Sequence, residues 1–514
     1  MLRYLQLIFI SLLVPHVAFL QVPSGCGTPT IKSNWLQQYQ QRPNTLRKGL
    51  EEDTARLYIP MTLHNVGNDE GEIHTDILKI LDAFCTLNED FAPANIQFYL
   101  KGDIQYINNS AFNEHDSVLV GGLFMRQYDV PNTVNSYIVK DAGGNAGYNL
   151  PWASSAVNKA FIKKTDHVWA HELGHQFTLP HPFFGWENGV SHDQSTPHNY
   201  NDTAPEYVLA NYTIFKDTLW TDTLIIDTVL VEKVDGSNCH LAADGFCDTS
   251  PDYLGVRWSC TINGVSEIPQ TDPNGVAFRS DGSLIMSYAE DDCSGRFTPE
   301  QITAMRTYLQ EEQANLLNPP LLEAPITTVP LLNYPIGQEP VPANNIELSW
   351  EPVPNATHYV VQVGFNSSFP GNPGNFETKE TSIRLPELLI GRTFYWRVRP
   401  YNSFHTCTDH SVTESFIVSE LTGLETIDGL ESVSIYPTAA ALGNTINMEL
   451  QTSQTLTGQI NVVDLTGRVL YKQDIQNSLG YQRLEIATNS LAAGVYFINV
   501  SDGIGQYLQR VVLY

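Results

Sequence analysis

The sequence predicts a multidomain chain in which an α/β domain is followed by two all-β sandwich domains. Its 514 residues exceed the roughly 100 to 200 residues of one ordinary domain. Helical and strand-like patterns are mixed before residue 317. After a Pro-rich linker at 318–326, short strands bounded by Pro, Asn and Gly fill the chain.

The N-terminus has the parts of a secretory signal peptide at residues 1–20. Arg3 supplies a positive charge, and Leu5 to Val14 forms an apolar run that is too short to cross a bilayer. A buried N-terminal helix is the alternative interpretation. We expect cleavage near Leu20, and no later stretch is long and apolar enough to predict a membrane span.

The chain is strongly acidic, with a formal net charge of −28 and a pI near 4.7. A chain of this charge repels phosphate backbones and anionic lipid, so we expect neither nucleic acid nor a membrane surface as a partner. Together with the signal peptide, the composition predicts a protein that is secreted or attached to the cell surface.

The segment 21–55 is polar and weakly periodic, and we interpret it as a pro-segment that precedes an α/β domain at 56–317. In that domain, strands are expected at 57–66, 96–102 and 134–141, and helices at 72–91, 165–177 and 298–317. The first helix is expected to include Ile73, and Thr165 or Asp166 is expected to cap the second.

The two C-terminal regions resemble known β modules. The region 327–420 resembles a fibronectin type III sandwich. The residues that carry this resemblance are Trp350, Tyr359 and the run Tyr395 to Val398, which we expect in the core. A ligand-binding role is the weaker interpretation of these side chains. The region 428–514 resembles the C-terminal sorting domain of the Bacteroidetes type IX secretion system, and this resemblance implies delivery by that secretion machinery. The residues that carry it are Ile435-Tyr436-Pro437, Asp464, Gly467-Arg468 and Gly494 to Phe497.

The stretch HELGHQFTLPH, at 171–181, has the spacing of a metal site. On a helix, His171 and His175 share one face and can hold one zinc ion. The third ligand must come from beyond the helix, where His181 lies six residues after His175. Glu172 is placed to act as general base toward a water molecule that the zinc activates for attack on a peptide carbonyl.

This stretch resembles the extended zinc motif of the metzincin metalloproteases, and Met286 resembles their Met-turn. Tyr288 matches a tyrosine that binds zinc or stabilises the oxyanion in some metzincins. Further motifs are similar to the bacterial, cytophagalysin-like members of the pappalysin family: Cys26-Gly27-Thr28, Asp244, Cys247, Asp248 and Thr249. Over 26–316, the resemblance implies a metzincin catalytic domain with a mixed twisted sheet, an active-site helix and a cleft. It also implies a zinc endopeptidase that cleaves proteins or peptides.

Three positions depart from the family pattern: Thr178 replaces a Gly, Ser250 precedes Pro251, and Leu284 replaces an Asn. A Gly at position 178 would let the chain turn sharply, and its loss costs about 1 kcal/mol. Apparent zinc-binding energies are about 10 kcal/mol, and a non-Gly residue can also turn with ordinary dihedral angles. We therefore expect a working site.

Seven cysteines are present, and export favours disulfides. We expect Cys239 to pair with Cys247 and Cys260 with Cys293, although spacing does not fix the connectivity. The resemblance also implies structural calcium, whose oxygen ligands are not assigned. The candidates are Asp235, Asp244, Asp248, Asp252, Asp291 and Asp292.

The odd cysteine is assigned to Cys26. If the pro-segment crosses the cleft, its thiolate can occupy the fourth zinc position and keep the zymogen latent, which is the cysteine switch known in metzincins. Cleavage between Arg47 and Arg56 would release it. The alternative is a disulfide between Cys26 and Cys85 or Cys407.

The main hypothesis for function is a secreted zinc endopeptidase, because both the expected metal ligands and the expected base are present. The alternative is a cell-surface adhesin in which the β domains bind partners and the metalloprotease domain is vestigial. A zinc hydrolase with a non-peptide substrate has no specific support in the sequence.

Overall fold

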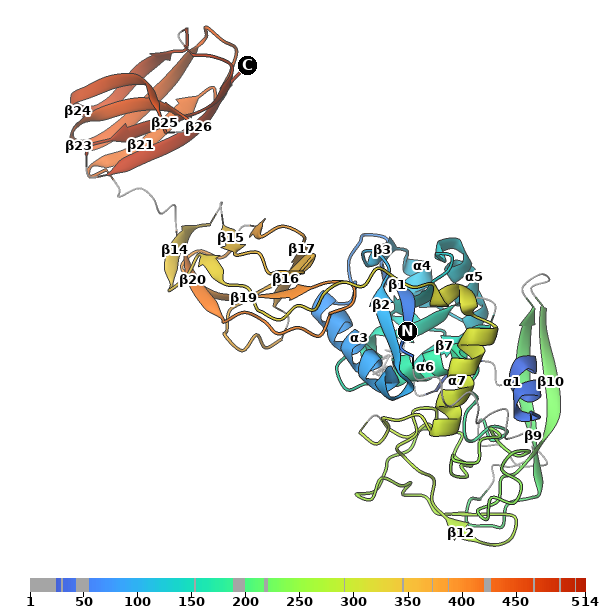
Figure 1. The fold of residues 1–514 in the computed structure, drawn as a ribbon. Helices are drawn as coiled ribbons and strands as arrows, with labels where there is room; N and C mark the ends of the chain where they lie inside the picture. Colours follow the sequence, from blue (N-terminus) through green and yellow to red (C-terminus); the bar gives the residue numbers. More distant parts are fainter. Residues whose placement is uncertain are drawn as a thin grey trace, which may run out of the picture. The chain divides into compact units, whose positions relative to one another are not determined.

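The computed structural model divides the protein into two compact units (Figure 1). The described residues are 25–28, 31–42, 55–151, 154–187, 199–216, 221–290, 292–343, 346–371, 373–386, 388–419, 427–465, 467–489, 491–503 and 505–514. Unit 1 comprises Met1–Thr328, Pro354–His358 and Pro400–Asp409, and unit 2 comprises Val329–Val353, Tyr359–Arg399 and His410–Tyr514. The expected signal peptide, Arg47 and Asp291 lie outside the described residues.

The main sheet of unit 1 is mixed. Its strand order is β2 (Ile96–Leu100), β1 (Leu57–Gly67), β5 (Val134–Val139), β8 (Ser155–Asn158) and β7 (Gly147–Asn149), with β3 (Gln105–Asn108) also paired to β1. Neighbouring strands are parallel except for β7, which runs antiparallel to β8. Strand β7 is last in the strand order, so its outer edge can pair with another extended segment.

The helices of unit 1 are α1 (Asn34–Gln40), α3 (Ile77–Phe91), α4 (Ser110–Asn113), α5 (Val118–Tyr128), α6 (Val168–Gln176) and α7 (Pro299–Glu311). Two expected helix starts are wrong. Helix α3 begins after its cap Asp76, and Ile73 is exposed with a φ of 55°. Helix α6 begins after its cap His167. Thr165 has a φ of 68° and lies outside the helix, and Asp166 accepts a hydrogen bond from the Val168 N–H without being the cap.

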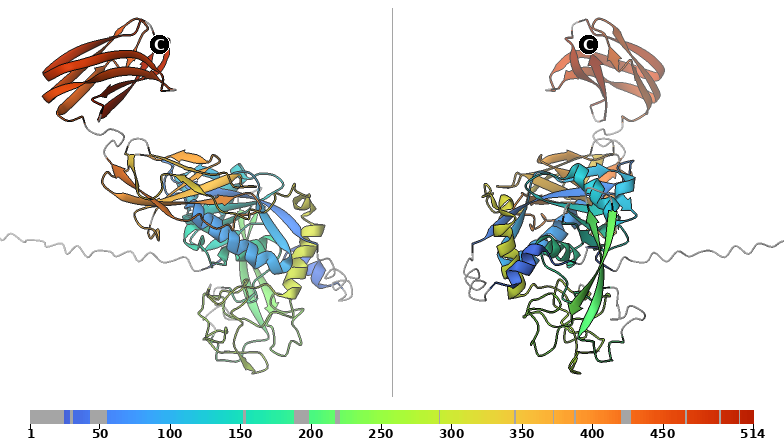
Figure 2. Two further views of the ribbon diagram at one scale, coloured as in Figure 1. Left: turned by 60° about the vertical axis from the view of Figure 1, so that its left-hand side comes forward. Right: turned by 90° about the vertical axis from the view of Figure 1, so that its right-hand side faces the viewer.

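The part of unit 1 after α6 consists mostly of loops, with a long hairpin of β9 (Tyr207–Lys216) and β10 (Thr221–Leu230) (Figure 2, green). Its shorter strands are β11 (Gln270–Thr271) and β12 (Ala277–Phe278), and β4 (Glu114–His115) pairs with β6 (Asp141–Ala142) nearer the main sheet. Short 3-10 turns occur at Ala92–Ala94, Lys159–Phe161 and Ala314–Leu317.

The expected disulfides Cys239–Cys247 and Cys260–Cys293 are both present and tie these loops together. A third disulfide joins Cys85 to Cys407 within unit 1. The alternative interpretation, in which Cys26 pairs with one of these two cysteines, is therefore wrong. Cys26 is the free thiol, as the main interpretation assumed.

Unit 2 begins with a β sandwich. One sheet has the order β13 (Leu332–Tyr334), β15 (Glu347–Trp350) and β18 (Ser382–Arg384). The other has the order β14 (Glu339–Pro342), β20 (Glu414–Ser419), β19 (Thr393–Tyr401), β16 (His358–Gly364) and β17 (Gly374–Thr378). The aromatic residues Trp350, Tyr359 and Trp396 are buried, which supports their interpretation as core residues.

The last module of unit 2 is a separate sheet with its own core. It consists of β21 (Leu430–Tyr436), β22 (Ala439–Ala440), β23 (Thr445–Asp464), β24 (Val469–Ala487), β25 (Gly494–Ser501) and β26 (Gln506–Leu513). Buried residues alternate with partly exposed ones along β25, so one face of this strand packs inward.

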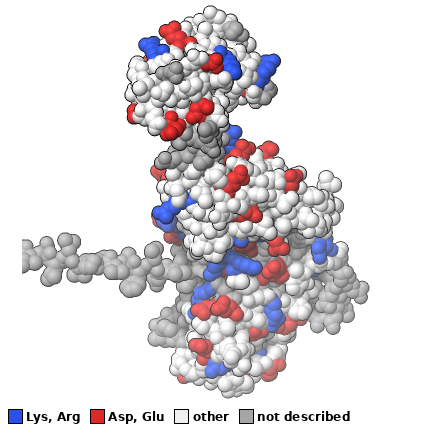
Figure 3. Space-filling view, turned by 90° about the vertical axis from the view of Figure 1, so that its left-hand side faces the viewer, with Lys and Arg blue, Asp and Glu red and all other residues white. Residues whose placement is uncertain are grey.

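Among the described residues, no helix combines the length and the apolarity needed to cross a bilayer. On the face drawn in Figure 3, acidic and basic side chains are interspersed among uncharged ones.

Candidate metal centre

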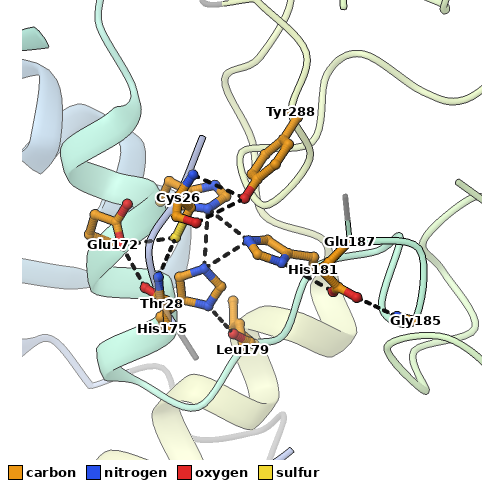
Figure 4. A network of polar contacts seen from close by, with 10 residues as sticks. Cys26, Thr28, Glu172, His175, Leu179, His181, Gly185, Glu187 and Tyr288 are labelled. Carbon is orange, nitrogen blue, oxygen red and sulfur yellow. Dashed lines mark hydrogen bonds and ion pairs between the residues drawn. The ribbon is translucent and has the colours of Figure 1, made fainter. Parts of the chain in front are cut away.

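Three histidines converge at the C-terminal end of α6 (Figure 4). Helix α6 carries His171 and His175 on one face, and the chain then turns back to bring in His181. The Nε2 atoms of His175 and His171 are 3.1 Å apart, those of His175 and His181 are 3.1 Å apart, and those of His171 and His181 are 3.2 Å apart. Sequence spacing therefore predicted a trio of side chains that does meet in space.

The turn between the second and third histidines has the left-handed conformation that favours glycine. Thr178 has a φ of 80°, so the expectation that it turns with ordinary dihedral angles is wrong. The Thr178 N–H donates to the His175 carbonyl at 3.0 Å, and the Leu179 N–H donates to the Gly174 carbonyl at 2.9 Å. These bonds satisfy backbone groups at the helix end and help to hold the strained turn.

The opposite ring nitrogens fix the tautomers of the histidines. His171 Nδ1 donates to the Ile285 carbonyl at 2.8 Å, and His175 Nδ1 donates to the Leu179 carbonyl at 2.7 Å. His181 Nδ1 faces Glu187 Oε1 at 3.5 Å. Since carbonyls only accept, the Nε2 atoms of His171 and His175 carry lone pairs when these rings are neutral.

The buried environment favours the neutral form of all three imidazole rings. Burial lowers the pKa of His171 to about 4 and lowers the pKa values of His175 and His181 well below their usual value. Neutral rings with converging lone pairs repel one another at about 3 Å unless a cation lies between them. The arrangement therefore calls for a metal ion.

The donor set fits zinc. A tetrahedral zinc ion with Zn–N distances of about 2.0–2.1 Å requires nitrogen–nitrogen separations of about 3.3 Å, close to those of the three Nε2 atoms. The Cys26 sulfur is the fourth member of this group, whose ligand atoms all lie within 4.8 Å of one another. Imidazole and thiolate ligands bind zinc in preference to calcium or magnesium.

Glu172 lies beside this group and is fully buried. Its Oε2 accepts a hydrogen bond from Thr28 Oγ1 at 3.0 Å and one from the Cys26 thiol at 3.4 Å. Its Oε1 is buried without a hydrogen-bond partner among the described residues. Burial raises the pKa of Glu172 to about 8. Gly147 makes room for this carboxyl, because a Cβ there would lie 2.8 Å from Oε1.

Met286 and Tyr288 lie below and beside the histidines. Met286 is buried against Gly174 of α6, where a Cβ would overlap its sulfur. The Tyr288 ring centroid is 5.0 Å from that of His181, and its hydroxyl oxygen accepts a hydrogen bond from the Cys26 N–H at 3.0 Å. The structure therefore places Tyr288 beside the histidines, and the role of Met286 in a Met-turn stays a prediction.

The segment around Cys26 lies along the edge strand β7. It forms a parallel bridge between Cys26 and Gly147, in which the Gly27 N–H donates to the Gly147 carbonyl at 2.8 Å. The Ala146 N–H donates to the Gly25 carbonyl at 2.8 Å, and Thr28 Oγ1 accepts from the Asn149 N–H at 2.8 Å. The segment therefore occupies hydrogen-bonding groups that an extended peptide would need.

Helix α1 fastens the same segment at a second place. Arg42 forms a two-point ion pair with Glu311 of α7, with both nitrogen–oxygen distances 2.7 Å. The Trp35 indole N–H also donates to Glu311 at 2.7 Å, and Leu36 and Tyr39 are buried. The hydroxyls of Ser33 and Thr178 are 2.8 Å apart, so the unusual turn residue contacts the cap of α1.

Sequence reasoning missed several of these contacts. Glu187, Thr28 and Ser33 have no recognisable motif, because their roles depend on how distant segments meet. For Glu187, the only available signal was a carboxylate six residues after the third histidine, which is a common secondary partner of a metal-bound imidazole.

The acidic residues considered for calcium do not form a cluster of three carboxylates among the described residues. Asp244 accepts from the Phe246 N–H and from Thr249, and Asp252 accepts from the Leu254 N–H, Ser280 and Ser287. These carboxylates hold turns together, and calcium binding stays a prediction.

Comparisons with known proteins identify the C-terminal module. Residues 434–514 match the family model of the secretion system C-terminal sorting domain. The chain is therefore a secreted protein, of a kind often attached to the cell surface, and the predicted type IX sorting module is confirmed. No curated protein matches the chain in sequence.

Two solved structures are similar to parts of the chain. One contains the FN1–FN3 domains of chicken CNTN1, with 12% identity and a TM-score of 0.17; the match covers 36% of this chain and 66% of that one, just under two thirds. The other is a domain of a protein described as a cell surface protein of Methanosarcina acetivorans, with 15% identity and a TM-score of 0.15, covering 17% of this chain and 94% of that one. These likenesses carry no argument about function.

Removal of the sorting module should block export and leave unit 1 folded. A chain that ends at Ser419 lacks the last sheet but keeps unit 1 unchanged, so we expect it to accumulate in the periplasm with unit 1 folded. Cell fractionation with antibodies against unit 1 measures this. Delivery of the shortened chain to the surface or medium at the normal level would show that the module is not needed for export.

Proposed function

We propose that unit 1 is a zinc-dependent endopeptidase of metzincin type, similar to the pappalysins, which is made as a latent precursor. The convergence of the three Nε2 atoms, with the tautomers of His171 and His175 fixed by backbone carbonyls, is the observation that carries this proposal. A vestigial site would not need to retain three deprotonated imidazoles at ligand separation beside a buried carboxylate.

Zinc, when bound, would supply a positive charge that polarises a substrate carbonyl and lowers the pKa of a water molecule. Glu172 would accept the proton of the attacking water and pass it to the leaving nitrogen, since its carboxyl lies beside the three histidines and is shielded from solvent. Burial favours the protonated form of this carboxyl, whereas the nearby positive charge of the metal would favour the carboxylate needed by a base.

Two other groups would hold the substrate. The Tyr288 hydroxyl, which now contacts the Cys26 backbone, could donate a hydrogen bond to the oxygen on which negative charge develops. The edge of β7 would bind the substrate backbone at the Gly147 carbonyl and the Asn149 N–H, the two groups now bonded by the pro-segment.

The same contacts explain latency. Cys26 would complete the metal coordination and exclude water, while the Thr28 hydroxyl donates a hydrogen bond to the Glu172 carboxylate. The pro-segment therefore covers the metal, the base and the substrate edge together. Arg56 lies at the start of the folded domain, and cleavage before it would break the covalent link between the domain and this segment.

The direct test is digestion of a peptide library by the processed protein, with and without a chelator. We expect cleavage that stops when zinc is removed and returns when zinc is restored. Zinc bound at one ion per chain without any cleavage would favour the second candidate, a cell-surface adhesin. The sorting module and the β sandwich of unit 2 are the features that favour that candidate.

Substitution of Thr178 tests whether having Thr in place of Gly at this position affects catalysis or latency. Thr178→Gly relieves strain of about 1 kcal/mol, so the mature activity should change by less than about tenfold. It also removes the hydroxyl contact to Ser33. The uncut precursor should therefore gain about fivefold in residual activity, if that hydrogen bond contributes about 1 kcal/mol.

Ser33→Ala is a companion variant, because it removes the same hydrogen bond and leaves the turn unchanged, although it also removes the cap bond that Ser33 accepts from the Leu36 N–H at the start of α1. It should raise the residual activity of the precursor and have no effect after processing. A hundredfold gain of mature activity in Thr178→Gly would instead show that the natural site is impaired.

A further inference from the structure

A small cavity of about 30 Å³ lies directly beside the candidate metal centre. Its walls include Cys26, His171, Glu172 and Tyr288, so it opens onto the groups proposed to act on the peptide bond. The remaining wall comes from other segments and includes Arg257. A space of this size accepts about two water molecules, which is comparable to the oxygens of one carboxylate.

The segment that carries Arg257 is fixed on both sides. On one side, Gly255 forms a parallel bridge with Glu187, and it approaches the Trp186 backbone so closely that a Cβ would overlap the carbonyl. On the other side, the Trp258 N–H donates to the Tyr288 carbonyl at 3.1 Å. The segment therefore spans the distance from a residue that supports His181 to the tyrosine of the site.

Arg257 is the only Arg or Lys among the residues that line this cavity. Its guanidinium carbon is 5.7 Å from the centre of the Phe161 ring, and such stacking restricts where the group can lie. A guanidinium has five N–H donors, so it can bind a carboxylate while it keeps other contacts. The chain is acidic as a whole, and Arg257 places a guanidinium group at this wall of the site.

The latent state closes the cavity from one side. Gly25 and Cys26 belong to its lining, and both come from the segment that must leave before a substrate can bind. Departure of that segment would enlarge the space without moving Arg257, whose neighbours belong to the folded domain.

Resting on the endopeptidase function proposed above, we propose that this cavity receives the side chain of a residue next to the scissile bond, and that Arg257 makes the enzyme prefer Glu or Asp there. A bidentate pair between the guanidinium and a partly buried carboxylate is strong and geometrically specific. It rejects the amide of equal size, because the amide offers only one acceptor oxygen and carries no charge.

The experiment uses the full chain after removal of the segment before Arg56 and, in parallel, the full chain with Cys26→Ala. Peptides of one sequence carry Glu, Gln or Lys at each position flanking the cleaved bond. We expect kcat/KM to be about 10- to 100-fold higher for Glu than for Gln at one of these positions, and lower still for Lys. In Arg257→Gln, the ratio of Glu to Gln should fall to about one, and Arg257→Glu should favour Lys.

Cleavage of the library with equal rates for Glu, Gln and Lys at every position would overturn the inference and leave the proposed function standing. The same holds if a Glu preference survives in Arg257→Gln. Absence of any cleavage by zinc-loaded protein would remove both proposals together. The substrate series with the natural chain gives a result even if an Arg257 variant does not fold.

Discussion

Replacement of Glu172 by Gln is expected to reduce peptide cleavage by about 10²- to 10⁴-fold, the usual contribution of a general base. The zinc content should remain that of the natural protein, because the three histidines and their supporting partners Ile285, Leu179 and Glu187 are unchanged. Gln has the size of Glu and fits beside Gly147, so packing is preserved. Metal analysis and peptide kinetics on the same sample separate these two effects.

Glu70→Gln is a suitable control, because Glu70 is exposed in unit 1. It changes the charge by the same amount and should leave cleavage as it was. If Glu172→Gln kept activity within tenfold of the natural protein, the assignment of the base would be wrong. A loss of both zinc and activity would mean instead that the carboxylate supports the metal site.

Local spacing was sufficient to predict that the three histidines meet. Two histidines four residues apart share a helical face in any regular α-helix, and His181 returns to them after the short turn at the end of α6. Met286 was expected beneath the site from the resemblance, and the absence of a Cβ at Gly174 is what allows its sulfur to pack there. The core of the sandwich followed from its buried aromatic residues.

Contacts between distant segments could not be predicted in this way. The pairing of Cys85 with Cys407 joins residues separated by 322 positions, and no spacing rule connects them. The Ser33–Thr178 contact joins a pro-segment helix to the turn after α6. The left-handed φ of Thr178 also ran against its residue type, because the requirement to bring His181 back to the helix outweighs about 1 kcal/mol of local strain.

If unit 1 has the proposed activity, the pro-segment contacts would let the single thiol of Cys26 govern it. A cysteine tethered next to the metal by a short flexible link has an effective concentration of roughly millimolar. The effective concentration is higher when the segment is held rigidly. Here the segment is fixed at the bridge between Cys26 and Gly147 and again at the Arg42–Glu311 ion pair. Burial and the neighbouring Glu172 carboxylate raise the pKa of the Cys26 thiol, so a metal would be needed to stabilise its thiolate.

Cys26→Ala should therefore make the uncut precursor at least about 100-fold more active than the natural precursor, since the tethered ligand is lost. It removes no disulfide, because Cys26 is the free cysteine, so stability should change little. Gln38→Ala, at an exposed position of α1, is the matched control and should leave the precursor latent. A second measurement does not depend on catalysis: in the natural precursor, a thiol reagent should react with Cys26 only after a chelator removes zinc. A natural precursor that cleaves peptides at the rate of the processed protein, with a thiol that reacts freely in the presence of zinc, would show that Cys26 is not a switch.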